Sequence, residues 1–184
     1  MEKMRQDDDI SLTFLKHPAV WSVTIARLLI ALFIFANPLW GLILSVIADW
    51  IDKHILMFTT GITLSQYQLW DKNVDWFAYV VELSVATTYG LYLPFFLLLF
   101  WRFIGQFMFL RTHKRWIFIL FPNYFEVAFL WLVVFHQRKF TIDISTDPAS
   151  FWLVVLLVAK QIHEIYLHYI LPTYKLDELF FMSR

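Results

Sequence analysis

The stretch WFAYVVELSVATTYGLYLPFFLLLFWRFIGQFMF, residues 76–109, decides the class of fold. Its 34 residues include only two charged side chains, and as one helix they would extend about 51 Å at 1.5 Å per residue. Because the hydrocarbon core of a bilayer is about 30 Å thick, the stretch predicts two membrane-spanning helices. Gly90 and Pro94 mark the turn between them.

Apolar runs on both sides of this stretch extend the pattern to six spans. A first run ends at Asn37-Pro38, because proline cannot continue a helix and its predecessor favours extended geometry. A second run reaches spanning length only if its helix continues through Asp49 and Asp52 to about Met57. The expected spans are residues 20–36, 39–57, the two halves of 76–109, 116–135 and 151–171.

The composition supports an all-α polytopic membrane protein. The chain is 60% hydrophobic and 16% charged, whereas soluble domains average about 25% charged residues. Its formal net charge is zero, so no overall field favours nucleic acid, and the absence of cysteine excludes disulfides and thiolate chemistry. We expect one transmembrane domain over residues 1–184, with an N-terminal segment at 1–18, a six-helix bundle at 19–171 and a tail at 172–184.

Basic residues predict the orientation of these spans. With six spans, both termini share one side with the loops at 53–72 and 110–115, and that side holds ten Lys and Arg residues against two on the other. The positive-inside rule places the termini in the cytoplasm. Residues 9–17, DISLTFLKH, predict a short amphipathic helix on the cytoplasmic leaflet.

Two pairs of aspartates lie at this cytoplasmic boundary, in ADWIDKH at 48–54 and YQLWDKNVDW at 67–76. Asp49 and Asp52 are spaced i,i+3, and Asp71 and Asp75 are spaced i,i+4, so each pair shares one helix face. One interpretation is ordinary helix ends, with Asp71 as an N-cap and the first pair in a solvated loop. Four converging carboxylates would instead require cations, and all-oxygen ligands suit Mg²⁺, Mn²⁺ or Ca²⁺, often in pairs.

Other polar side chains lie inside or near the apolar spans. A charge within a membrane is costly, so we expect these side chains to pair with one another or to line a cavity. For Arg102 the alternatives are an ion pair with Glu82 and contact with a substrate phosphate. The histidines near the end of the last span are expected to be satisfied by neighbours rather than to hold a second metal. The set comprises Arg27, Glu82, Arg102, Gln106, Asn123, Glu126, Lys160, His163, Glu164 and His168.

The aspartate pattern resembles the CDP-alcohol phosphatidyltransferases. Their signature, D-x2-D-G-x2-A-R-x8-G-x3-D-x3-D, spans the second and third of six transmembrane helices, and the four aspartates match it here. HPAVWSVTIARLL, with Thr24 and Arg27, is similar to the stretch that opens the family's first span. The chain departs from the signature at Lys53, Leu56 and Met57, at the later glycine, and in an interval one residue longer between the pairs.

The resemblance implies a mechanism and its residues. Asp49, Asp52 and Asp71 would hold two divalent ions, Mg²⁺ or Mn²⁺, and Asp75 would be the general base with a further ligand role. The reaction would transfer a phosphatidyl-type group from a CDP-linked donor to an alcohol acceptor in phospholipid synthesis and release CMP. Lys53, Arg102 and Glu82 are candidate substrate-binding residues, with a solvated lysine as the alternative for Lys53.

Two other classes of function stay open. One is a catalytically silent relative that acts as a structural or regulatory membrane protein. The other is a small transporter whose carboxylates bind ions in transit, although the spans lack the glycine-broken helices of many transporters. Family members are commonly homodimers, and a homodimer is an open alternative here.

Overall fold

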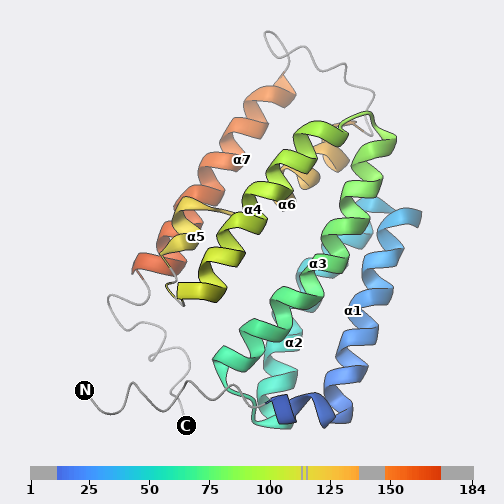
Figure 1. The fold of residues 1–184 in the computed structure, drawn as a ribbon. Coiled ribbons are helices and arrows are strands. Elements are labelled where there is room, and N and C mark those ends of the chain that lie inside the picture. Colours follow the sequence, from blue (N-terminus) through green and yellow to red (C-terminus); the bar gives the residue numbers. More distant parts are fainter. Residues whose placement is uncertain (1–11, 113, 115, 137–147, 171–184) are drawn as a thin grey trace. The chain divides into compact units, whose positions relative to one another are not determined.

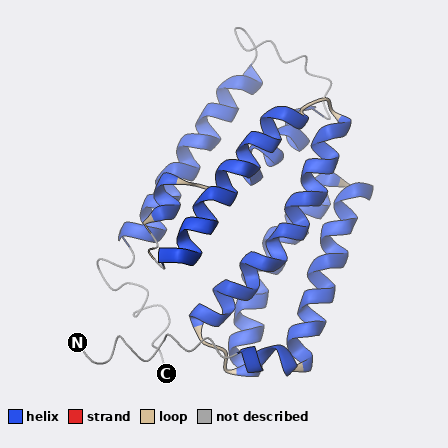
Figure 2. Cartoon of the chain, in the orientation of Figure 1, coloured by secondary structure: helices blue, strands red, loops and turns tan. Residues whose placement is uncertain are grey.

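The computed structural model describes residues 12–112, 114, 116–136 and 148–170, and this described part is helical without a strand (Figures 1 and 2). Its residues up to Val85 form one compact unit, unit 1, and those from Ala86 onward form a second, unit 2. Unit 1 contains the 3₁₀ helix η2 (Leu12–Lys16), α1 (Pro18–Ala36), α2 (Pro38–Thr60) and most of α3 (Leu64–Thr88).

The helices α1 and α2 form a hairpin that turns at Asn37. The Asn37 side chain accepts a hydrogen bond from the backbone N–H of Trp40, and Pro38 occupies the first helical position, where it costs no hydrogen bond. Further along α2, Gly41 lies against the backbone of Ile34, and a Cβ there would come within 2.7 Å of the Ile34 Cα. The predicted break at Asn37-Pro38 is confirmed, and a glycine lets the two helices pack closely.

The helix α2 continues through the first aspartate pair, as its length requires, and ends at Thr60 before Gly61 in the left-handed conformation. Only three residues then separate it from α3. The predicted loop at 53–72 is therefore wrong. Asp71 lies two turns inside α3, so the N-cap interpretation is also wrong, as is the solvated loop for Asp49 and Asp52. The sequence QYQLWDKN is polar but contains no helix breaker.

A small core joins the four helical segments of unit 1. It consists of Phe14, Val20, Leu56, Ile62, Tyr67 and Trp70. The indole N–H of Trp70 donates a hydrogen bond to Thr24 Oγ1 at 3.1 Å, which fixes α3 against α1 one turn before Arg27. Within the predicted helix at residues 9–17, the structure describes the short 3₁₀ helix η2 at Leu12–Lys16; residues 9–11 lie outside the described part, and its position on a membrane surface stays a prediction.

Unit 2 contains α4 (Tyr92–Thr112), α5 (Ile117–Leu120), α6 (Tyr124–Trp131), the π-helix η3 (Leu132–His136), α7 (Pro148–Ile165) and the π-helix η4 (Tyr166–Ile170). The predicted turn between the halves of 76–109 is confirmed, with Gly90 at a φ of 76°. The predicted span at 116–135 is interrupted after Leu120, because Pro122 cannot donate a helical hydrogen bond. Gly105 of α4 packs closely against Phe121 at this interruption.

Four helical segments are long and apolar enough to cross a membrane: residues 18–36, 92–112, 117–135 and 150–170. Many of their large apolar side chains are exposed, and Phe151, Ile162 and Tyr169 are each more than 60% exposed. A soluble monomer rarely exposes so much contiguous apolar surface. The described residues thus include four helical segments that could cross a membrane, as judged by length and composition.

Candidate metal centre

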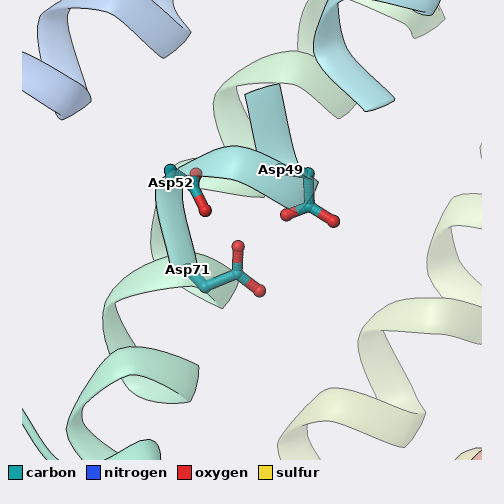
Figure 3. A group of neighbouring side chains, drawn as sticks. All are labelled: Asp49, Asp52 and Asp71. Atoms are coloured by element: carbon teal, nitrogen blue, oxygen red, sulfur yellow. The ribbon is translucent and has the colours of Figure 1, made fainter. Parts of the chain in front are cut away.

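The four predicted aspartates converge on the side chain of Arg27. Asp49 and Asp52 project from consecutive turns of α2, and Asp71 and Asp75 project from consecutive turns of α3. Figure 3 shows the carboxylates of Asp49, Asp52 and Asp71 facing a common space. The i,i+3 and i,i+4 spacings therefore do bring each pair to one helix face, and the two faces meet.

The guanidinium of Arg27 contacts every one of the four carboxylates. Its Nη1 lies 3.2 Å from Asp49 Oδ1, 2.7 Å from Asp52 Oδ2 and 2.8 Å from Asp71 Oδ1. Its Nη2 donates to Asp75 Oδ1 at 2.7 Å. The Arg27 side chain is only 10% exposed, so these contacts are made largely out of water.

Two further side chains hold the carboxylates in place. Lys72 Nζ lies 2.6 Å from Asp71 Oδ2 and 2.9 Å from Asp75 Oδ2. The Tyr67 hydroxyl donates a 2.6 Å hydrogen bond to Asp52 Oδ1. Asp52 and Asp71 thus each have one oxygen held by a neighbour and one directed at Arg27.

The charges of the cluster do not balance. Counted with every carboxylate ionised, the four aspartates exceed the two side-chain cations, Arg27 and Lys72, by two negative charges. Asp52, Asp71 and Asp75 are all buried, whereas the side chain of Asp49 is 54% exposed. Like charges held this close repel one another. One divalent cation would balance the excess of two negative charges.

Three of the aspartates have the geometry of a metal site. One carboxylate oxygen from each of Asp49, Asp52 and Asp71 lies within 4.8 Å of the other two. All three ligand atoms are oxygens, which suits Mg²⁺, Mn²⁺ or Ca²⁺. Asp75 lies beside this group, and its carboxylate contacts the other terminal guanidinium nitrogen of Arg27, Nη2. The residues fit a divalent cation, and a side-chain cation already lies among them.

A small cavity adjoins Arg27 and is lined by residues of α1, α2 and α3. Its volume is about 20 Å³, which is room for about one water molecule. Ser45 supplies a hydroxyl, and the other walls are apolar. Besides Arg27 and Ser45, the cavity is lined by Ile30, Ala31, Ala48, Val74 and Ala78.

The three predicted substrate-binding residues lie on three different helices. Lys53 follows Asp52 on α2 and is half-buried, and Glu82 is 2% exposed on α3, in unit 1. Arg102 is 6% exposed on α4, in unit 2. It donates to the Phe121 carbonyl at 3.2 Å, and its guanidinium lies 4.7 Å from the centre of the Phe118 ring. Substrate contact by these residues stays a prediction.

Two polar side chains of the last span pair with Glu164, whereas the Nδ1 atom of His168 is buried without a hydrogen-bond partner in the described part of the chain. Lys160 Nζ lies 2.9 Å from Glu164 Oε1, and His168 Nε2 lies 3.0 Å from Glu164 Oε2. Gln106 on α4 behaves differently. Its amide is buried, and neither the oxygen nor the nitrogen has a hydrogen-bond partner in the described part of the chain.

Arg27 is the residue at this centre that the aspartate pattern did not identify. Its sequence signal is a charged residue inside the apolar run VWSVTIARLLIALFIFA. That position predicts an ion pair but not which carboxylates form it. Lys72 and Tyr67 were likewise missed, because their contacts depend on how α2 and α3 pack.

Comparisons of the chain with protein-family models, with curated proteins and with solved structures found no match.

Proposed function

We propose that the chain is a metal-dependent membrane phosphotransferase of the kind that the CDP-alcohol phosphatidyltransferases represent. It transfers a phosphatidyl-type group from a CDP-linked lipid donor to an alcohol and releases CMP. The observation that carries the proposal is the convergence of Asp49, Asp52, Asp71 and Asp75, from two helices, around one cation. A merely structural ion pair needs one carboxylate for an arginine.

The roles proposed for the residues are those that the resemblance implies. Asp49, Asp52 and Asp71 would hold divalent ions, which would supply positive charge to offset the charge that develops on the attacking and leaving oxygens. Asp75 stands beside this group and takes the proton of the acceptor hydroxyl. The acceptor oxygen forms a bond to the lipid-linked phosphorus, the bond from that phosphorus to the CMP oxygen breaks, and CMP leaves.

The proposed enzyme spans the membrane six times. In addition to the four apolar segments, α2 and α3 cross the bilayer, and their charged turns are tolerated because the carboxylates and Arg27 neutralise one another in part. Both termini and the aspartates then face the cytoplasm, where basic residues predominate. η2 lies at the membrane surface.

The test is CMP release by the purified protein in detergent with Mg²⁺ or Mn²⁺, CDP-diacylglycerol and a panel of alcohols. Asp75→Asn should lower the rate by about 10²- to 10⁴-fold, the typical contribution of a general base. Glu126→Gln makes the same chemical change in unit 2 and should retain the wild-type rate. If the wild type binds Mn²⁺ but releases no CMP with any alcohol, the chain is a silent relative and the enzymatic proposal fails.

A further inference from the structure

The nitrogen atom Nη1 of Arg27 occupies the place that a metal ion would take. It lies 2.7–3.2 Å from one oxygen of each aspartate in the candidate metal group. Magnesium binds carboxylate oxygens at about 2.0–2.1 Å, and calcium at about 2.3–2.6 Å. An ion at such distances from these oxygens leaves no room for the guanidinium nitrogen, so the two must exclude each other.

The charge of the cluster changes sign when ions enter. Counted with every carboxylate ionised, the metal-free cluster has two more negative charges than Arg27 and Lys72 supply positive ones. Two divalent ions would neutralise the four carboxylates and leave the charges of Arg27 and Lys72 without partners. A guanidinium does not lose its proton in a protein, so Arg27 must then find another anion. Its planar fork suits the paired oxygens of a phosphate group.

Resting on the proposed function, we infer that Arg27 is the resident cation of the metal-free cluster and becomes a phosphate ligand once divalent ions displace it. The cavity of about 20 Å³ beside Arg27 means that the side chain is not packed tightly on every side. Thr24 and Trp70 hold the neighbouring turn of α1, so the movement is confined to the Arg27 side chain. Arg27 thereby couples metal occupancy to binding of the substrate's phosphates.

The experiment compares Arg27→Gln with Lys72→Gln, which removes an equal charge from the same carboxylates. Binding of Mn²⁺ alone should be about tenfold or more tighter in Arg27→Gln than in the wild type, because a competitor is gone. Binding of inorganic pyrophosphate in saturating Mg²⁺ should be about tenfold or more weaker. Lys72→Gln should change both affinities by clearly less. Equal changes of both affinities in the two variants would show that Arg27 acts only through its charge and would overturn the inference.

A second measurement follows the wild type itself and uses a conservative variant only to assign the signal. Arginine labelled with ¹³C at Cζ gives a signal for Arg27, assigned with Arg27→Lys and followed by NMR in detergent. The signal should move on addition of Mg²⁺ and again on addition of pyrophosphate, while the Arg102 signal stays unchanged. If Mg²⁺ binds and the Arg27 signal does not move, the exchange is refuted. If the wild type binds no divalent ion, the proposed function itself fails.

Discussion

Two buried arginines, Arg27 in unit 1 and Arg102 in unit 2, have opposite surroundings. Arg27 contacts four carboxylates from two other helices. Arg102 has one backbone carbonyl and the face of Phe118, and Glu164 attracts it from beyond ion-pair distance in the described part of its unit. Both interrupt apolar helices, so a charge in a span does not by itself identify a site. The surplus of carboxylates around Arg27 does, because it calls for more cations than the chain supplies.

The largest expected effect is that of Arg27→Met on stability. Removing one partner of a buried ion pair typically costs about 3–5 kcal/mol, because the remaining charges stay uncompensated. We expect a loss of this size in the free energy of unfolding in detergent without metal. Saturating Mg²⁺ should recover much of it, since the ion then replaces the guanidinium. A loss below about 1 kcal/mol would show that the carboxylates are not held by Arg27.

Tyr67→Phe should have the next largest effect. It removes the hydroxyl that donates to Asp52 Oδ1 at 2.6 Å, and a hydrogen bond to a charged group contributes about 1.5–3 kcal/mol. The unfolding free energy should fall by that amount, and the Mn²⁺ affinity should fall because Asp52 is less firmly positioned. Tyr124→Phe serves as the control in unit 2, where the hydroxyl donates to the neutral Gln161 side chain, and it should cost less.

Gln106→Leu should stabilise the protein. The buried amide has no hydrogen-bond partner in the described residues, and a buried unsatisfied polar group costs about 1–3 kcal/mol. Leucine has a similar size, so we expect a gain of about 1–2 kcal/mol in the unfolding free energy without a change in Mn²⁺ affinity. A clear destabilisation would instead reveal a partner for this amide that the described residues do not contain.

The smallest effect is expected for Arg102→Met, the counterpart of Arg27→Met. The change removes one hydrogen bond and a cation–π contact, but it also removes a buried charge that lacks an ion pair. These contributions oppose each other, so the unfolding free energy should stay within about 1 kcal/mol of the wild-type value. A loss as large as that of Arg27→Met would abolish the contrast between the two arginines and would indicate an anionic partner for Arg102.

The sequence predicts the elements well where local chemistry decides them. Asn37-Pro38 and Gly90 act through their own backbone geometry, and both turns are where they were expected. The loop at 53–72 was mispredicted because polar residues in α3 face a buried cluster rather than water. Pro122 carried a local signal for the break in the fifth apolar run that the hydropathy of the run concealed.

In the candidate site, too, the sequence predicts what depends on one helix and misses what depends on the packing of several. The spacing of the aspartates predicts which carboxylates share a helix face, and that is confirmed for both pairs. The spacing cannot indicate that Arg27 of α1 lies between the pairs, or that Tyr67 reaches Asp52, because these contacts depend on the packing of separate helices. The polar side chains in the spans were also expected to pair with one another or to line a cavity. Pairing holds for Arg27 and Glu164 but not for the Gln106 amide in the described residues.

The most direct test of the metal centre is a Mn²⁺ titration of the wild type beside the double variant Asp52→Asn/Asp71→Asn. We predict saturable binding to the wild type, with about 2.7 kcal/mol added to the unfolding free energy at a hundredfold excess over Kd. The double variant should stay folded, since it relieves carboxylate repulsion, and should show neither effect. Equal Mn²⁺ binding by both proteins, or none by the wild type, would contradict a metal centre at the four aspartates.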